Sequence, residues 1–311
     1  MTLHEKPTPS PTLSIGMPVY NGEEYIHEAL DSLLAQTFTD FELVISDNAS
    51  IDNTEAICRE YAARDPRIRY VRQTQNRGAM PNFQFVLAEA RGECFMWAAA
   101  DDRWDNSWIA TLMPHLRSEA VSVAFGCVAS LVDQTQSTTR TTLSSLRGPV
   151  TFRVLRYFFW REAGAKPNVI YGLYRTSQLR NAAAEVLTAG ADNRLGVDNL
   201  LVFRMLHVGC SHVDPGVTFY KRSRQHTGDS RITRLIAATA VQLLRLRYVP
   251  YFIEHIRTSP SMFVRCAVVL AIPIKYPCSI LDCFGVVAHR ALKRASAMIS
   301  FRGRVARPGA R

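Results

Sequence analysis

Two adjacent aspartates, Asp101 and Asp102, are the residues whose type and spacing point most directly to chemistry. They follow an apolar stretch that starts at Cys94 and reads C-F-M-W-A-A-A, and a run of this length is typical of a buried strand. In open α/β sheets, ligands bind where such strands end. Adjacent carboxylates repel each other unless a cation neutralises them, and Mg²⁺ and Mn²⁺ prefer carboxylate and phosphate oxygens. The pair therefore predicts a metal–diphosphate site, with capping of a helix over residues 106–119 as the alternative.

The same succession of an apolar stretch and polar residues occurs three more times in the first part of the chain. Strand-like stretches lie at residues 13–17, 41–46 and 68–72, and helical patterns lie at residues 23–36, 52–64 and 81–90. The polar residues that follow the strands are Tyr20, Asn21, Asp47, Asn48, Asn76 and Arg77. This alternation predicts an α/β fold with a mostly parallel sheet flanked by helices, whose βα loops form a nucleotide crevice. The sequence lacks the G-x-G-x-x-G and G-x-x-x-x-G-K-[ST] motifs of other nucleotide sites.

Beyond residue 115 the pattern is less regular, but one carboxylate stands out. Strand-like stretches at 121–128, 168–174 and 213–220 and helical stretches at 152–160, 177–187 and 199–208 surround a Thr- and Ser-rich loop at 133–148. Asp198 lies in the sequence L-G-V-D-N-L-L, directly before one of these helices. A carboxylate near a helix N-terminus has its pKa lowered, so it is ionised and can accept a proton. The alternative is that Asp198 caps the helix.

The positive charge of the chain is concentrated at its C-terminal end. The net charge is +10, yet residues 231–311 hold 14 of the 37 Lys and Arg and only two of the 27 Asp and Glu, which leaves the remainder at −2. A nearly neutral first part argues against a nucleic-acid enzyme with a basic groove. The apolar stretch 262–274 is too short to cross a bilayer alone. We therefore expect a basic, amphipathic helical tail on an anionic membrane surface, with packing of the tail on the sheet as the alternative.

Five motifs in the first part, in order and at consistent spacing, resemble those of a known enzyme family. They are P-V-Y-N-G-E-E-Y-I at 18–26, S-L-L-A-Q-T-F-T-D-F-E-L-V-I-S-D-N-A-S-I-D-N-T at 32–54, D-P-R-I-R-Y at 65–70, Q-N-R-G at 75–78 and A-D-D-R-W at 100–104. They make residues 13 to about 115 similar to the nucleotide-sugar-binding half of glycosyltransferase family 2, the inverting enzymes with the GT-A fold. The later residues match that family only loosely.

The resemblance implies a UDP- or dTDP-sugar donor and a Mg²⁺ or Mn²⁺ ion. The donor-binding residues that it implies are Pro18, Tyr20, Asn21, Asp47, Asn48, Asn76, Arg77, Gly78, Asp101, Arg222, Arg224 and His226. Asp47 would accept the imide N–H of uracil or thymine, and the last three residues would lie over the diphosphate, unless they form a solvated basic turn. Asp102 would be the main metal ligand with Asp101 in support, because Ala100 occupies the first place of the family's D-x-D motif.

The resemblance also implies a general base, an aspartate at a helix start in the second half of the domain. Asp198 fits this description best, and Asp192 and Asp214 are its competitors. The implied reaction is inverting transfer of the sugar to a hydroxyl of a lipid-linked or cell-surface glycan. A sugar-phosphate nucleotidyltransferase is the alternative enzyme, although the loop after the first strand is acidic where those enzymes carry basic residues. A non-catalytic nucleotide-sugar-binding scaffold is the third hypothesis.

The resulting domain organisation has four parts. Residues 1–11 are expected to be a disordered lead-in, 12–115 the nucleotide-sugar-binding half, 116–230 the acceptor-binding half and 231–311 the basic tail. The seven cysteines form no C-x-x-C pair, which is typical of reduced thiols in the cytosol. We therefore expect a cytoplasmic protein that lies on the inner face of the cell membrane.

Overall fold

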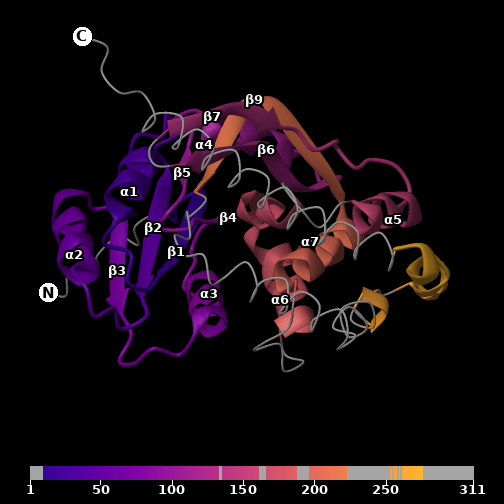
Figure 1. Ribbon diagram of the computed structural model, residues 1–311, viewed down its shortest axis with the longest axis horizontal. Helices are drawn as coiled ribbons and strands as arrows, with labels where there is room; N and C mark the ends of the chain where they lie inside the picture. Colours follow the sequence, from indigo (N-terminus) through magenta and orange to yellow (C-terminus); the bar gives the residue numbers. More distant parts are fainter. Residues whose placement is uncertain are drawn as a thin grey trace, which may run out of the picture.

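The computed structural model describes residues 10–132, 135–160, 166–187, 196–222, 253, 255–257, 259 and 261–275. Over these ranges the chain forms a sheet of nine strands with helices packed around it (Figure 1). The strand order is β3-β2-β1-β4-β8-β6-β9-β5, and β7 pairs with β6 outside this path. The expected α/β architecture with a sheet flanked by helices is confirmed.

The first half of the sheet is parallel and is built from apolar strands. Its elements are β1 (Leu13–Val19), α1 (Ile26–Leu34), β2 (Phe41–Asp47), α2 (Thr54–Arg64), β3 (Ile68–Arg72), α3 (Ala79–Ala88) and β4 (Cys94–Trp97). Strand β1 lies between β2 and β4 and is parallel to both. Every residue of β2 and β4 is buried, as expected where parallel strands are covered on both faces. All four strands therefore end at one edge, where their βα loops meet.

The second half of the sheet is mixed. Its elements are β5 (Arg103–Trp104), α4 (Trp108–Leu112), η1 (Met113–Arg117), β6 (Val121–Val132), β7 (Thr135–Thr141), α5 (Val150–Phe159), η2 (Lys166–Tyr171), β8 (Leu173–Arg175), α6 (Thr176–Leu187), α7 (Val197–Val208) and β9 (Cys210–Arg222). Strand β8 is antiparallel to both β4 and β6 and so joins the two halves. Strand β9 runs parallel to β6 and antiparallel to the short β5. This pairing carries the end of β9 to the turn that follows β4.

Two stretches differ from the sequence-based expectation. The stretch 168–174 was expected to be a strand, but η2 occupies its first part and β8 has only three residues. At the junction, a Cβ on Gly172 would lie 2.7 Å from the carbonyl oxygen of Ala124, so only glycine allows this close approach to β6. The expected loop at 133–148 contains β7, whose threonines are β-branched and favour a strand paired with β6.

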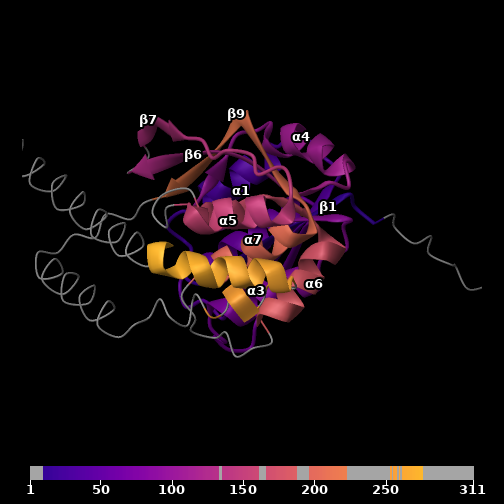
Figure 2. The same cartoon turned by 90° about the vertical axis from the view of Figure 1, so that its right-hand side faces the viewer.

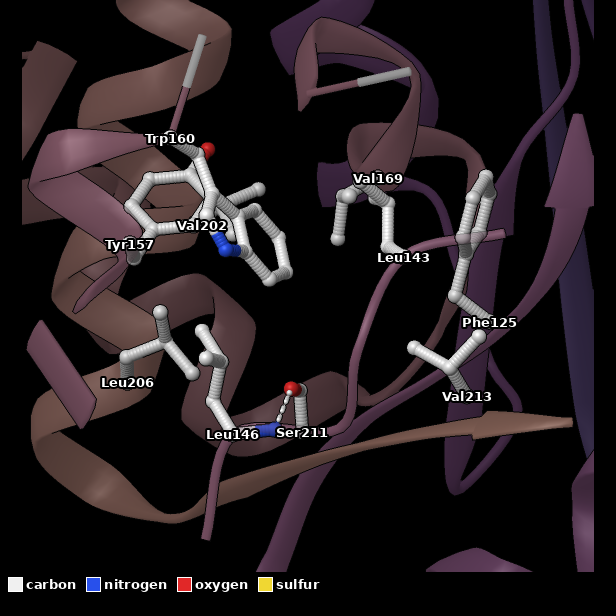
Figure 3. A pocket seen from close by; sticks show the side chains of 10 residues that line it. All are labelled: Phe125, Leu143, Leu146, Tyr157, Trp160, Val169, Val202, Leu206, Ser211 and Val213. Atoms are coloured by element: carbon white, nitrogen blue, oxygen red, sulfur yellow. Dashed lines mark hydrogen bonds between the residues drawn. The ribbon is translucent and has the colours of Figure 1, made fainter. Parts of the chain in front are cut away.

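The core of the second half contains a small apolar cavity between α5, α7 and β6 (Figure 3). Its walls include Tyr157, Trp160, Val202 and Leu206, and its volume is about 10 Å³. That volume is about the size of one water probe, and a cavity with apolar walls stays dry. The cavity is therefore a packing defect and is too small to be a substrate site.

A helix at residues 262–275 packs against α5 and α7, as Figure 2 shows in yellow. His255, which precedes it, lies between the rings of Phe158 and Phe203 at 5.4 and 4.6 Å. Lys275 donates a hydrogen bond from Nζ to the carbonyl oxygen of Trp160. Among the described residues, no helix is long and apolar enough to cross a bilayer. Most of the expected tail at 231–311 lies outside the described residues.

Candidate functional site

Asn48 joins the loops that follow β2 and β3. Its side-chain nitrogen donates hydrogen bonds to Oδ1 of Asn76 at 2.9 Å and to the carbonyl oxygen of Gly78 at 3.0 Å. Its side-chain oxygen accepts the backbone N–H of Arg77 at 3.0 Å. Gly78 has a φ of +87°, a conformation that favours glycine, directly before α3. The structure therefore brings these four predicted residues together.

Asp47 is fully buried at the end of β2. Its Oδ1 accepts the N–H of Ser50 at 2.8 Å, and its Oδ2 accepts the hydroxyl of Tyr70 at 2.7 Å and Nη1 of Arg72 at 3.0 Å. Burial, followed by this hydrogen bond to Asp47, raises the pKa of Tyr70 well above its ordinary value. The carboxylate thus fixes the turn in which Ala49 has a φ of +60°. Its expected contact with the donor base stays a prediction.

Asn21 connects the loop after β1 to the loop after β2. Its N–H donates to Oγ of Ser50 at 2.9 Å, and its side-chain oxygen accepts the N–H of Ile51 at 3.0 Å. The neighbouring Tyr20 is 46% exposed, so its ring is free to stack on a ligand. Pro18 is half-buried within β1, opposite Ser46. The expected donor-binding residues of the first two loops therefore lie on one edge of the sheet.

Asp102 does not cap a helix, because α4 begins at Trp108 and Ser107 is its N-cap residue. The Asp102 side chain is only 1% exposed and points at the end of β9. Its Oδ2 accepts a hydrogen bond from Nζ of Lys221 at 2.8 Å, and its Oδ1 accepts the N–H of Arg222 at 2.9 Å. Burial raises the pKa of Asp102 to about 6, against the opposing effect of Lys221. The predicted metal ligand is thus part of a buried ion pair.

Arg222 holds the turn at Asp101 against helix α1. Its Nε donates to the carbonyl oxygen of Asp101 at 2.9 Å, and its Nη2 donates to Oε2 of Glu28 at 2.6 Å. Its guanidinium lies over the ring of Tyr25, 4.1 Å from the centroid. These contacts make Arg222 a structural tie of the site, and its expected role over a diphosphate stays a prediction. Arg224 and His226 lie outside the described residues.

Lys221 is the site residue that sequence reasoning missed. Besides Asp102, its ammonium group lies 5.4 Å from the ring centroid of Tyr171. Burial lowers the pKa of Lys221, but Tyr171, Asp102 and Asp101 outweigh this effect and raise it, so the amine is protonated. In the sequence, Lys221 is visible as the first residue of the K-R pair that follows the strand-like stretch 213–220, but only Arg222 of this pair was expected at the site.

Lys221 and Asp198 line the same pocket, which has a volume of about 430 Å³. This volume is in the range of small-molecule sites. The residues that line the pocket come from α3, η2, the start of α7 and the ends of β4 and β9. Most of its lining is apolar or aromatic, namely Met80, Phe83, Trp97, Pro167, Ile170, Tyr171, Val197 and Leu201. The structure therefore places a carboxylate and a cation at one apolar hollow.

The start of α7 positions Asp198. Gly196 is the N-cap residue with a φ of +77°, so the chain turns sharply into the helix, and Asp198 lies in the first turn. One oxygen of Asp198 accepts the N–H of Asn199 at 2.8 Å. The pKa of Tyr171 is raised to about 12, mainly by burial. Lys221 lowers this pKa, and the carboxylates of Asp102, Asp101 and Asp198 raise it. Asp198 is thus electrostatically coupled to the same tyrosine as the aspartate pair.

Asp214, a competitor of Asp198 for the role of base, lies elsewhere. It is near the beginning of β9, where its Oδ2 lies 3.3 Å from Nε2 of His115. Lys221 lies at the other end of the same strand. Asp214 is also not among the residues that line the pocket of Asp198. The second competitor, Asp192, lies outside the described residues.

The chemistry of the aspartate pair suits a divalent metal that substrate phosphates complete. Mg²⁺ is usually held by one or two carboxylates together with phosphate oxygens, and Asp101 and Asp102 offer carboxylates at one turn. Both oxygens of Asp102 already accept hydrogen bonds, and the ammonium group of Lys221 lies 2.8 Å from Oδ2, so an ion at this oxygen would compete with Lys221. The residues present therefore fit such an ion, in competition with Lys221.

Comparison with known proteins identifies the family. The sequence model of glycosyl transferase family 2 matches residues 14–181, more than half of the chain. The chain belongs to glycosyl transferase family 2. This confirms the family that the five motifs resembled. The matched residues include the loops after β1 to β4 and end within α6.

Relatives by sequence share mainly the first part of the chain. An uncharacterized protein of Mycobacterium tuberculosis is 46% identical over 97 residues, which are 30% of this chain and 28% of the relative. The glycosyltransferase GlyA of Streptococcus pneumoniae is 24% identical over 171 residues, 55% of this chain and 23% of the relative. The chain thus spans less than a third of either relative's length.

Solved structures show the same fold at low sequence identity. Residues 1–349 of TarS from Staphylococcus aureus match with a TM-score of 0.57 at 15% identity, covering 91% of this chain and 92% of that one. The mannosyltransferase PcManGT from Pyrobaculum calidifontis, solved with GDP-Man and Mn²⁺, matches with a TM-score of 0.57 at 18% identity, covering 96% and 81%. These similarities confirm the expected GT-A fold.

Proposed function

We propose that this chain is an inverting glycosyltransferase that moves a sugar from a UDP- or dTDP-sugar to a hydroxyl of a lipid-linked or cell-surface glycan. One observation carries the proposal: Asp198 and Lys221, the ion-pair partner of Asp102, line a single pocket of about 430 Å³. Inverting transfer needs a base on one side of the sugar and positive charge beside the leaving diphosphate on the other. Membership of the family and the ligands of related structures, UDP-GlcNAc, UDP and GDP-Man, support a nucleotide-sugar donor.

In this mechanism the Asp198 carboxylate accepts the proton of the attacking acceptor hydroxyl. The hydrogen bond that the N–H of Asn199 donates to Oδ1 of Asp198 helps to orient this carboxylate in the first turn of α7. Lys221 donates hydrogen bonds to the departing diphosphate once it turns from Asp102. A Mg²⁺ or Mn²⁺ ion held by Asp102 and Asp101 would supply further positive charge to the diphosphate.

The acceptor side of the pocket favours a substrate with an apolar part. Phe83 and Trp97 lie near each other, with ring centroids 6.3 Å apart, and Met80, Ile170 and Leu201 continue this surface. An apolar wall beside a single carboxylate suits either a sugar ring that stacks on an aromatic face or the first carbons of a lipid. This lining is compatible with both acceptors of the proposal, the lipid-linked and the cell-surface glycan.

The helix at 262–275 supports attachment to a membrane surface. Its buried side chains, such as Val264 and Val268, face the protein, while Phe263 and Leu270 are 71% and 77% exposed. Phe263 and Leu270 are seven residues apart and so lie on one stripe of the helix. An apolar stripe next to a strongly basic segment fits an interface helix on anionic lipid. We therefore propose that the enzyme lies on the cytoplasmic face of the cell membrane, with this helix at the lipid surface.

Substitution of Asp198, the proposed base, tests sugar transfer separately from donor binding. The Asp198→Asn variant keeps the shape of the side chain and loses the proton acceptor, so turnover should fall about 10²- to 10⁴-fold. Its affinity for a donor, measured by thermal shift over a panel of UDP- and dTDP-sugars with and without Mn²⁺, should stay unchanged. Wild-type turnover in Asp198→Asn would refute the assignment of the base, and the absence of any nucleotide-sugar effect on the wild-type protein would refute the proposed function.

A further inference from the structure

Two histidines and an aspartate meet at the end of β9 that is remote from Lys221. His115 comes from η1, and His212 and Asp214 come from the first residues of β9. One ligand atom from each of the three residues lies within 4.8 Å of the others. In the part of the chain that the structure describes, no other group of three or more His, Cys, Asp or Glu has this spacing. The donor site therefore does not account for this cluster.

The distances in the cluster suit one small cation. Nε2 of His115 and Oδ2 of Asp214 are 3.3 Å apart. Two ligands of a tetrahedral zinc ion, each bonded at about 2.0–2.1 Å, lie about 3.3 Å from each other. The rings of His115 and His212 stack with centroids 3.6 Å apart and an interplanar angle of 21°. Two imidazoles bound to one tetrahedral zinc ion have ring centroids about 5 Å apart, so the stacked rings must separate by about 1.5 Å and turn toward the ion. The partial exposure of both side chains allows this rotation.

The surroundings hold one of the ligands in place. Oδ1 of Asp214 accepts the N–H of Gly216 at 2.7 Å, which leaves Oδ2 directed at His115. Such hydrogen bonds to the outer side of a ligand are typical of metal sites. His115 lies on η1, and His212 lies opposite Ala124 in the pairing of β6 with β9. All three are partly exposed, so an ion can enter from solvent.

One positive charge faces the cluster. Nη2 of Arg147 lies 3.3 Å from Nδ1 of His212, at an exposed position from which the long side chain can turn away. Arg147 therefore competes with a cation for His212 without blocking access to it.

We propose that His115, His212 and Asp214 form a Zn²⁺ site with three protein ligands and a fourth position for water. Nitrogen and carboxylate ligands in this number are typical of zinc, whereas Mg²⁺ prefers oxygen ligands alone. The bound ion would link η1 to the start of β9 and so anchor the strand whose other end carries Lys221. The proposal is independent of the proposed function, because it concerns different residues and a different ion.

The test is a zinc titration of the full chain, followed by isothermal calorimetry and by the visible spectrum of the Co²⁺-loaded protein. We expect one ion per chain and the intense visible bands of tetrahedral Co²⁺. The variants His212→Gln and Asp214→Asn should each weaken binding at least about tenfold. Arg147→Ala should strengthen it, because it removes the competing charge.

Asp102→Asn is the matched control, since it alters the donor site and leaves this cluster intact. Zinc affinity should be unchanged in that variant, and circular dichroism should show that each variant is folded. Retention of wild-type zinc affinity in His212→Gln and Asp214→Asn would overturn the proposal. Binding of less than one ion per two chains, or equal loss in Asp102→Asn, would overturn it as well.

Discussion

Replacing Lys221 by methionine removes the charge that faces Asp102 and keeps most of the aliphatic stem. In the wild-type protein Nζ lies 2.8 Å from Oδ2 of an aspartate that is 1% exposed. Removal of one partner from a fully buried ion pair costs about 3–5 kcal/mol, because the remaining charge is left without compensation. The Lys221 side chain is one-third exposed, so water screens part of the interaction. We therefore expect Lys221→Met to lower the free energy of unfolding by about 2–3 kcal/mol at pH 8.

The loss should depend on pH through Asp102. Its pKa is about 6 in the folded protein and 3.8 ordinarily, so between these values the folded state keeps a proton that the unfolded state has released. The contribution of Asp102 to the free energy of unfolding is fully present below about pH 4. It is lost as the pH rises through about 6, by roughly 3 kcal/mol in total. Without Lys221 the pKa rises further, and the decline continues above pH 6. The deficit of Lys221→Met should therefore be small near pH 5 and full at pH 8.

Urea unfolding at both pH values measures the effect. Arg103→Met is the matched control, because Arg103 is a basic residue on the neighbouring β5 whose guanidinium lies over the ring of Tyr220. Adding Asp102→Asn to Lys221→Met should recover most of the stability, since a neutral amide needs no counter-charge. An equal deficit at pH 5 and pH 8, or no recovery in the double variant, would refute the role assigned to this ion pair.

Two further predictions concern the loops and the helix at 262–275. Asn48→Ala removes three hydrogen bonds to residues 76–78. We expect the affinity for the donor to fall about tenfold with little change in turnover. An unchanged KM for the donor would contradict the role of this loop. The double variant Phe263→Asp/Leu270→Asp should no longer sediment with anionic vesicles. The control Val269→Thr changes an exposed side chain without adding charge and should still sediment with them. Equal binding by both variants would argue against this membrane surface.

Much of the parallel half of the sheet could be predicted, because its strands are short apolar runs that end in polar residues. The loops containing Asn48 and Asn76 contact each other as predicted, because the carboxyl ends of parallel strands lie at the same edge of the sheet. The pattern failed where tertiary contacts decide the structure. Residues 168–171 belong to η2 (Lys166–Tyr171), and the close approach of Gly172 to β6 is not encoded in local hydrophobicity.

The partner of Asp102 could not be predicted from spacing. Lys221 lies 119 residues away, and a basic residue at a strand end is usually solvated. Only the antiparallel pairing of β5 with β9, which sets Arg103 opposite Tyr220, brings Lys221 to the aspartate turn. The type of residue at the site was visible in the sequence, but the register of two distant strands was not.

The long reach of these contacts has a consequence for the order in which the protein folds. Arg222 joins Glu28 across 194 residues, and Lys221 must arrive before Asp102 has a counter-charge. Contacts of such sequence separation form late, because the intervening chain must first be ordered. During synthesis, β1 to β4 can therefore pair while the carboxylate at their edge still lacks its cation. The Asp102–Lys221 pair is completed only when β9 has left the ribosome, so this part of the site forms after the parallel half of the sheet.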